Sequence, residues 1–398
     1  MLEVTFVVIF VAILAWLVGK RSHLRLRVRL ELLGLVLAVL VAGVYVVAKR
    51  VETGLGGVTH LHDRFPWGLW IGCDLCGIAL AAGGFVLAAA VHIFRIRRFE
   101  PIIRPVVLTS LIAYLVVAAI LVLDLGRPYR FWHPLIMWQP HSVMFEITLC
   151  ISLYSLVLTM ELSPVLFERL GWRRLSAAVH ELALPLVLVG VILSTLHQSS
   201  FGSLFLIVPQ KLHPLWYTPL LPVLFLVSAV CAGLAVVIVE SHLCARFLDA
   251  YLPRALMAEL GRVASQVLWI YVLLKVGDVW WRGAWGMLAT PPWLGLVWVV
   301  EVVGGGVIPE IWLSRIHREE PRGLIAAASL AIGGIVLNRL TVCWFGLLPY
   351  TGMVYAPSWM EWASTAALLV MGVLMFFGLA RFLPIFPVNF ASRNLSSR

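Results

Sequence analysis

Residues 103–123 read IRPVVLTSLIAYLVVAAILVL, and Arg104 is the one charged residue among them. An α-helix rises about 1.5 Å per residue, so a run of this length spans the roughly 30 Å hydrocarbon core of a lipid bilayer. A helix also satisfies its own backbone hydrogen bonds, which lipid cannot do for it. This stretch therefore predicts a transmembrane helix.

Similar apolar runs recur along the whole chain, with short polar segments between them. Of the 398 residues, 62% are hydrophobic and only 13% are charged, and the mean hydropathy is +0.98. These values exclude an ordinary soluble protein. They predict an all-α, polytopic membrane protein with eleven apolar spans, at about 4–19, 31–48, 67–94, 103–123, 142–163, 176–197, 215–245, 263–281, 292–314, 323–346 and 358–380.

The basic residues gather in alternate loops, for example Lys20 and Arg21 after the first span and Arg97 and Arg98 after the third. Cytoplasmic loops are enriched in Lys and Arg, so we expect these loops and the C-terminus inside, and the N-terminus outside. The net charge of +10 then reflects membrane orientation rather than a nucleic-acid partner. In the first span the charges follow the apolar stretch, which favours a retained helix over a signal peptide.

Six cysteines lie within or beside the apolar runs, which argues against a disulfide framework. Two of them form the sequence Cys73-Asp74-Leu75-Cys76. A thiol redox pair or half of a metal site is the alternative interpretation of that CxxC. We favour packing residues, because the segment has apolar neighbours and no second ligand pair, and we expect no metal site in this chain.

The segment Phe65–Asp74 opens the third span with Trp67 and Trp70. Two indoles at this position are also typical of an aromatic belt that anchors a helix at the membrane surface. Asp74 follows Trp67 by two helical turns, and a carboxylate at that depth costs roughly 2.5 to 3.5 kcal/mol on insertion scales. Such a position favours a quinone or proton-transfer role over a structural hydrogen bond.

Further polar groups stand where the neighbouring spans begin or end. Asp124 and Arg127 close the fourth span, where a local ion pair that caps the helix is the alternative to a ligand site. Glu146 lies about one turn inside the fifth span, and Tyr154 follows on roughly the same side. Membrane acids normally face the interior of a bundle, so we expect these groups to line one inner surface.

The histidines were weighed as quinone and haem ligands. We expect His197 to end the sixth span at the outer face, where it could hold a quinone carbonyl or only stabilise a loop. We expect His92, His180 and His242 near the inner ends of their spans. With no histidine expected in mid-span and no CxxCH sequence, a haem-free chain is favoured.

Two more charged positions fall within spans. Glu240 lies late in the seventh span, near the inner side, and is a candidate member of a proton path. Lys275 and Asp278 in the eighth span are three residues apart, so we expect them to neutralise one another in a structural ion pair.

These residues resemble the NrfD family, the membrane subunits of polysulfide reductase and related enzymes, and within it the hydrogenase-type, HybB-like branch. Each short motif is weak by itself, but seven occur in order across nearly the whole chain. They are Phe65–Asp74 (FPWGLWIGCD), Asp124–Arg127 (DLGR), Ser142–Glu146 (SVMFE), Leu166–Trp172 (LFERLGW), His197–Leu204 (HQSSFGSL), Lys211–Trp216 (KLHPLW) and Arg381–Pro387 (RFLPIFP).

The resemblance implies a bundle of about ten core transmembrane helices at residues 31–398, with residues 1–30 adding one extra N-terminal helix and a basic cytoplasmic loop. It implies a subunit of the bacterial or archaeal cytoplasmic membrane that binds no haem or metal. Electrons would pass between menaquinone or ubiquinone and a periplasm-facing iron–sulfur protein of a [NiFe]-hydrogenase-like complex. Asp74, Asp124 and Glu146 would lie at or near the quinone, and Glu146 and Glu240 would carry protons.

Other interpretations of the same features stay open. A related complex built around polysulfide, nitrite, molybdopterin or cytochrome c chemistry would use the same fold. A secondary transporter would explain intramembrane acids and the interruption Gly304-Gly305-Gly306 before Pro309, but no matching interruption stands in a symmetric position. A plain membrane anchor would not need so many interior acids.

Overall fold

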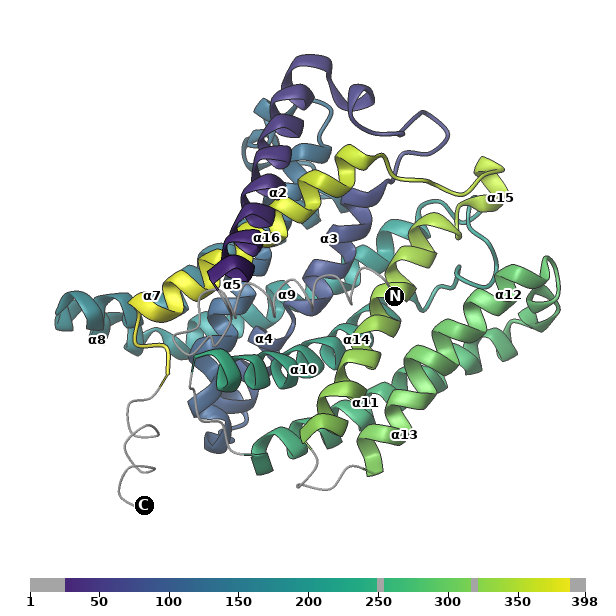
Figure 1. The fold of residues 1–398 in the computed structure, drawn as a ribbon. Coiled ribbons are helices and arrows are strands. Elements are labelled where there is room, and N and C mark those ends of the chain that lie inside the picture. Colours follow the sequence, from purple (N-terminus) through teal and green to yellow (C-terminus); the bar gives the residue numbers. More distant parts are fainter. Residues whose placement is uncertain (1–25, 249–253, 316–320, 387–398) are drawn as a thin grey trace.

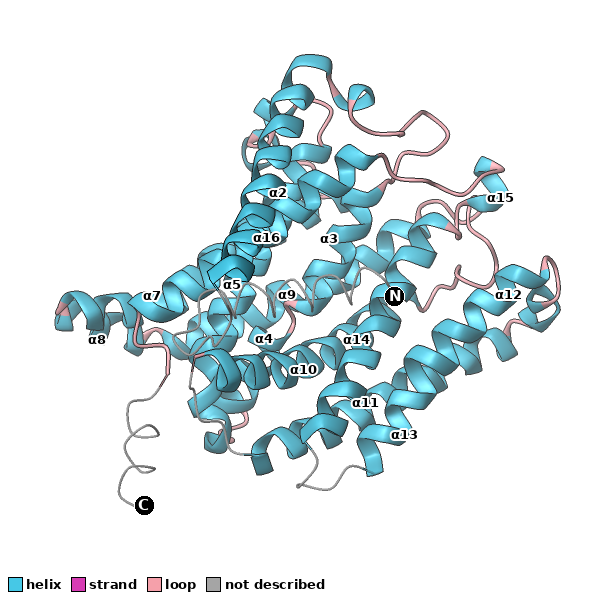
Figure 2. Cartoon of the chain, in the orientation of Figure 1, coloured by secondary structure: helices cyan, strands magenta, loops and turns pink. Residues whose placement is uncertain are grey.

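The structure is a computed structural model that describes residues 26–248, 254–315 and 321–386 (Figure 1). Ten helical segments among these residues are long and apolar enough to cross a membrane. They confirm the second to eleventh predicted spans, while the first, 4–19, lies outside the described residues. Figure 2 shows helices joined by loops and no strand in the described part of the chain.

The spans are built from the following elements. They are α2 (Leu26–Thr53), α3 (Leu69–Leu80) with α4 (Gly83–Ala88) and the π-helix η2 (Ala89–Ile93), α5 (Glu100–Asp124), α7 (Val143–Leu170), α9 (Ala183–Leu206), α10 (Leu221–Phe247), α11 (Arg254–Trp281), α12 (Pro292–Val299) with the π-helix η6 (Val300–Val307) and α13 (Ile308–Arg315), α14 (Pro321–Trp344) with α15 (Leu348–Thr351), and α16 (Trp359–Phe382). The connections hold η1 (Leu55–Gly57), η3 (Arg97–Phe99), η4 (Pro128–Arg130), α6 (His133–Ile136), α8 (Arg173–Glu181) and η5 (Ala284–Leu288).

Consecutive spans alternate in direction, so the longer connections meet at one end of the bundle. We call this end, with segments 54–68, 125–142, 207–220, 282–291 and 345–358, the loop-rich end. Contacts join these segments: Ser358 donates to the Val58 carbonyl, and the His213 N–H donates to Gly346 over 2.7 Å. The opposite, basic end carries η3 and α8, and the charge pattern predicts that it faces the cytoplasm.

Two helices form the centre of the molecule. In the most apolar stretch of each span, 67% of the residues are buried around α3 and 61% in α10, but only 17% in α2. Helix α10 packs against α3, α9, α11 and α14, whereas α2 packs against α16 at the edge of the bundle (Figure 1). Exposed apolar side chains on α2, such as Val41 and Val44, therefore face lipid in a membrane.

The sixth predicted span was wrong in its boundaries, because it merged two helices. Residues 173–181 form the separate helix α8, whose Arg173, Arg174 and His180 are too polar for hydrocarbon. The spanning helix α9 instead continues through the polar sequence after His197. It can do so because the Ser199 and Ser200 hydroxyls donate to carbonyls one turn earlier in the same helix, which satisfies these two hydroxyls without leaving the helix.

Close helix contacts depend on glycine at two crossings. A Cβ on Gly233 of α10 would lie 2.3 Å from the backbone nitrogen of Gly83 in α4. A Cβ on Gly305 of η6 would lie 2.2 Å from the Cα of Gly334 in α14. Small residues are typical of such approaches between membrane helices. These crossings join α10 to the third span and η6 to α14.

Candidate functional site

Asp74 occupies the interior of the bundle, as the sequence indicated. Its residue is 1% exposed on α3, and the carboxylate oxygen Oδ1 has no hydrogen-bond partner among the described residues. Asp124, at the end of α5, is close enough to interact with it electrostatically. Two acids thus stand near one another beside the loop-rich end, an unfavourable arrangement in hydrocarbon unless protons or hydrogen-bond partners compensate it.

A series of polar side chains continues from Asp74 toward the basic end. Tyr114 of α5 interacts with Asp74, and its ring meets that of Tyr154 of α7 edge to face at 4.7 Å. The hydroxyls of both tyrosines lie next to Ser194 of α9. Tyr154 also interacts with Glu161, which lies further along the same helix α7 toward the basic end. Groups that both give and accept protons therefore follow one another through the spans of α3, α5, α7 and α9.

His197 was expected at an outer helix end, and the structure corrects this. It lies inside α9 (Ala183–Leu206), is 0% exposed, and neither ring nitrogen has a hydrogen-bond partner among the described residues. Its ring packs against Tyr114 and Phe201, with centroids 5.7 and 4.7 Å away. His197 thus joins the Tyr114–Tyr154 group, and the expectation that no histidine stands in mid-span was wrong.

The capping ion pair between Asp124 and Arg127, the alternative to a ligand site in the sequence analysis, is not formed. Arg127 is exposed after α5, and no ion pair of it occurs among the described residues. Arg50 of α2 replaces it: the buried guanidinium interacts with Asp124 and donates from Nε to the Leu123 carbonyl over 3.0 Å. It also donates to the Leu125 carbonyl, so Arg50 neutralises the end of the α5 helix dipole.

The indole pair does not act as a unit. Trp70 is buried and donates from Nε1 to the Ser364 hydroxyl of α16 over 3.2 Å. Trp67 is half-buried and packs edge to face against Phe205 of α9, 5.2 Å between centroids. The two side chains therefore point to different neighbours, and Trp67 alone is on the α9 side with the polar series.

Glu146 and Glu240 lie near opposite ends of the bundle, as their positions in the sequence indicated. Glu146 is half-buried in the first turn of α7 and interacts with Cys150, which in turn is near Tyr114. Glu240 is on α10 in the half nearer the basic end, with both carboxylate oxygens enclosed and Thr109 beside them. The structure thus connects Glu146 to the polar series through Cys150.

A buried carboxylate that the sequence analysis missed holds the start of α16 against α3. Glu361 is 0% exposed and accepts hydrogen bonds from the Ser358 N–H at 2.8 Å and the Leu69 N–H at 3.2 Å. The Tyr355 hydroxyl donates to it at 2.8 Å. Burial raises the pKa of the Tyr355 phenol, which keeps this donor protonated. Glu361 also interacts with Asp124, so it adjoins the candidate site.

The ion pair expected between Lys275 and Asp278 was also wrong. Lys275 contacts Glu301 of η6, while Asp278 pairs with Arg282 over 2.6 Å. Sequence spacing favours a partner on the same helix, but here the partner of Lys275 comes from another span. Arg50 and Glu361 were missed for a related reason: each lies at the end of an apolar run, where a charge is ordinary in a membrane protein.

Metal and haem ligands were sought in the same interior. None of the six cysteines forms a disulfide, and the described residues contain no group of three or more His, Cys, Asp or Glu side chains that could hold a metal ion. His197, the one histidine deep in a described span, has Tyr114 and Phe201 as ring neighbours rather than a second histidine. This arrangement does not fit a bis-histidine haem.

The sequence of this chain matches a known protein family. The profile of the family described as "Polysulphide reductase, NrfD" matches residues 57–351, which include Asp74, Asp124 and His197. The chain belongs to the NrfD family. This confirms the resemblance drawn from the seven motifs and agrees with a multi-pass membrane protein of ten described spans.

Relatives of this NrfD protein cover most of its length. A protein of Nitratidesulfovibrio vulgaris is 41% identical over 81% of this chain and 86% of its own. The probable Ni/Fe-hydrogenase 2 b-type cytochrome subunit of Escherichia coli is 32% identical over 86% and 88% of the two chains. The menaquinone reductase integral membrane subunit of N. vulgaris is 30% identical over 87% and 89%. The E. coli relative is named as a b-type cytochrome subunit, and b-type cytochromes hold haem. The absence of haem from this chain therefore stays a prediction.

Proposed function

We propose that this NrfD protein is the integral membrane subunit of a respiratory oxidoreductase complex, in which an iron–sulfur partner at the loop-rich end exchanges electrons with membrane quinone. The carrying observation is the buried carboxylate of Asp74, which has an unsatisfied oxygen and a second acid, Asp124, nearby. A quinone takes up two electrons and two protons to become a quinol. Asp74 is placed to hold a quinone oxygen or to exchange a proton with it.

The rest of the proposed site follows from the side chains around Asp74. Trp67 would form the apolar wall toward α9, and Tyr154 and His197 would bound the deeper side through Tyr114. Trp70 and Arg127 would contribute at the rim, Trp70 by packing α16 in place and Arg127 from the exposed turn after Asp124. Glu146 and Glu240 would carry protons toward and away from this region.

The partner proposed is a periplasm-facing iron–sulfur protein with hydrogenase-like catalytic subunits, and menaquinone or ubiquinone is the substrate. Support comes from the names of two relatives, a Ni/Fe-hydrogenase subunit and a menaquinone reductase subunit. More distant relatives are named as selenate reductase and polysulfide reductase subunits, so another oxidoreductase with the same membrane module is the alternative. A secondary transporter is the remaining rival, since the spans containing η2 and η6 are interrupted.

Native mass spectrometry of the gently purified complex tests this function. We expect iron–sulfur and hydrogenase-like companion chains together with bound isoprenoid quinone. A different oxidoreductase among the companions would retain the quinone site but change the reaction. A lone chain without quinone that takes up a substrate into vesicles would overturn the proposal in favour of transport.

A further inference from the structure

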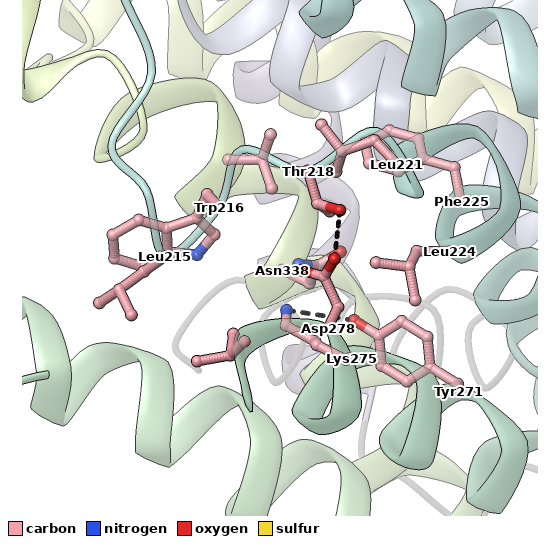
Figure 3. A pocket seen from close by; sticks show the side chains of 12 residues that line it. Leu215, Trp216, Thr218, Leu221, Leu224, Phe225, Tyr271, Lys275, Asp278 and Asn338 are labelled. Carbon is pink, nitrogen blue, oxygen red and sulfur yellow. Dashed lines mark hydrogen bonds between the residues drawn. The ribbon is translucent and has the colours of Figure 1, made fainter. Parts of the chain in front are cut away.

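A second buried polar cluster lies between α10, α11, η6 and α14, apart from the Asp74 region. Its members are Lys275, Asp278, Glu301, Asn338 and Arg339, all buried, and Figure 3 shows most of them around a cavity. The quinone proposal gives none of them a role. Burying this many ionisable groups at membrane depth is unfavourable unless they are paired, so the partners of each group decide its charge.

Glu301 is surrounded by hydrogen-bond donors. Its carboxylate accepts hydrogen bonds from four side chains, and donors around a carboxylate favour its charged form. These donors are Lys275, Asn338 at 2.8 Å, Trp216 at 3.1 Å and Thr341 at 2.8 Å. The π-helical turn of η6 brings Glu301 into this position, and such turns are frequent at functional sites.

Arg339 is a cation without a carboxylate of its own. Its residue is 0% exposed, and its nitrogens donate to the Asn338 side chain, the Phe225 carbonyl and the Ser228 hydroxyl. No ion pair of Arg339 occurs among the described residues, and its Nε has no partner there. Asp278 is balanced by Arg282, so Lys275 and Arg339 share one remaining anion, Glu301, and the cluster together with Arg282 carries one excess positive charge when both are protonated.

Only Lys275 can remove that excess. A guanidinium stays protonated in proteins, whereas a buried lysine amine can give up its proton. The titratable groups that face Lys275 are Tyr271 at 3.3 Å, Glu301, Arg339 and, one turn away, Asp278. With Lys275 neutral, Arg339 and Glu301 balance each other.

A cavity leads from Lys275 toward the loop-rich end. It measures about 10 Å³, room for roughly one water molecule, and its wall includes Lys275, Asp278, Thr218 and Asn338 (Figure 3). Beyond it, Asp278 accepts a hydrogen bond of 2.6 Å from Thr218 and pairs with Arg282. The Arg282 side chain is 22% exposed, so the ion pair separates the cavity from the solvent by one residue layer.

We propose that Lys275 is a proton-binding group that exchanges its proton with the loop-rich side through the cavity and Asp278. The ammonium gives one proton to a water in the cavity, that water passes a proton to the Asp278 carboxylate, and Asp278 releases it to solvent past Arg282. No electrons move in this step. The inference rests on the proposed function, since a redox complex supplies the cycle that would reload Lys275.

Substitution at Lys275 separates this role from a purely structural ion pair. Lys275→Arg keeps the charge and the contact with Glu301 but cannot release a proton, Lys275→Gln removes both, and Asp278→Asn keeps a hydrogen-bond partner for Thr218. Lys49→Arg is the matched control, because the Lys49 side chain is 35% exposed at the end of α2 and its ion pair among the described residues is with Glu52. Each variant is purified as the whole complex and checked for companion chains and melting temperature.

Infrared difference spectra between acidic and alkaline buffer detect proton release without any electron transfer. We expect an amine signal in the wild type and Lys49→Arg that disappears in both Lys275 variants. In proteoliposomes, we expect Lys275→Arg to lower protons moved per electron by roughly tenfold or more, with quinone reduction in detergent retained, and Asp278→Asn to slow proton release similarly.

The two readouts keep the inference distinct from the proposed function. An identical infrared signal in Lys275→Gln and wild type, or unchanged proton movement in Lys275→Arg, would show that Lys275 only holds helices together and would overturn the inference. A complex without quinone activity would overturn the proposed function, while the infrared result would still decide whether Lys275 binds an exchangeable proton.

Discussion

Asp74 is an acid that the fold buries without completing its hydrogen bonds. A carboxylate used only to join two helices would be expected to have both oxygens paired, as the Glu361 carboxylate does at the start of α16. Leaving one oxygen unsatisfied is unfavourable by about 1 to 3 kcal/mol. The contrast between these two buried acids is the residue-scale reason for placing the ligand at Asp74.

Replacing Asp74 with Asn tests that placement. The amide has nearly the same shape, so we expect the complex to assemble with an unchanged melting temperature. The amide cannot take up or give a proton, so we expect quinone reduction to fall by about 100-fold, the lower end of what a general acid or base contributes. Steady-state kinetics with a soluble quinone analogue measure the effect.

Asp63→Asn is the control for this substitution, since Asp63 is an exposed acid in the segment before α3. We expect its quinone activity to match the wild type. Full activity in Asp74→Asn would mean that the acid is structural and that the quinone binds elsewhere.

The sequence predicted the depth of individual buried residues better than it predicted which residues they pair with. The depth of Asp74 and Glu240 could be read from their distance along apolar runs. The partners of Lys275 and Asp124 could not, because Glu301 and Arg50 come from other spans and helix rotation is not encoded in spacing. His197 was misplaced because hydroxyls that bond to their own helix let α9 continue through a polar sequence.

At the scale of elements, η6 shows why a glycine run in a span does not require a flexible hinge. The sequence Gly304-Gly305-Gly306 indicated an interruption, and the structure has a π-helix there, packed against α14 through Gly334. The wide turn presents Glu301 to Lys275 and Asn338. The close packing against α14 and the wide π-helical turn therefore both act to position Glu301.

Gly305→Ala tests whether that crossing is rigid. The added methyl group would lie 2.2 Å from the Gly334 Cα, which is backbone and cannot turn aside. Overpacking of this kind is unfavourable by about 1 to 3 kcal/mol, so we expect a lower melting temperature for the purified protein in detergent. Thermal unfolding followed by tryptophan fluorescence measures it.

Gly277→Ala provides the comparison within the same bundle. Gly277 lies on an exposed face of α11 with nothing within 4 Å of an added Cβ, and alanine favours a helix over glycine. We expect an equal or higher melting temperature. If both variants melt like the wild type, the approach of η6 to α14 is looser than the structure indicates.

At the scale of the whole molecule, the polar groups reach toward both ends of the bundle. Asp124 and Asp74 lie near the loop-rich end, the tyrosine pair follows, and Glu240 lies in the half nearer the basic end. Composition and charge pattern were enough to predict a membrane bundle with ten of its spans. They could not show that Asp74 and Asp124 come near one another, since that depends on how α3 and α5 are rotated toward a common centre.

Glu240→Gln tests whether protons for the quinone enter from the basic end. Moving one charge through 100 mV involves about 2.3 kcal/mol, so uptake from that side would make the reaction sensitive to the membrane potential. Glutamine keeps the shape and the contact with Thr109 but cannot carry a proton. We expect an intact complex whose quinone reduction is roughly tenfold slower and no longer coupled to proton uptake from the basic side.

Proteoliposomes with a pH-sensitive dye on either side of the membrane measure this effect. Glu100→Gln is the control, because Glu100 is exposed at the basic end in the first turn of α5 and we expect it to behave as the wild type. Wild-type turnover and proton uptake in Glu240→Gln would show that the protons for the quinone do not pass through Glu240. The reaction would then move no protons across the membrane through Glu240, and the enclosed carboxylate would be part of the packing between α10 and α5.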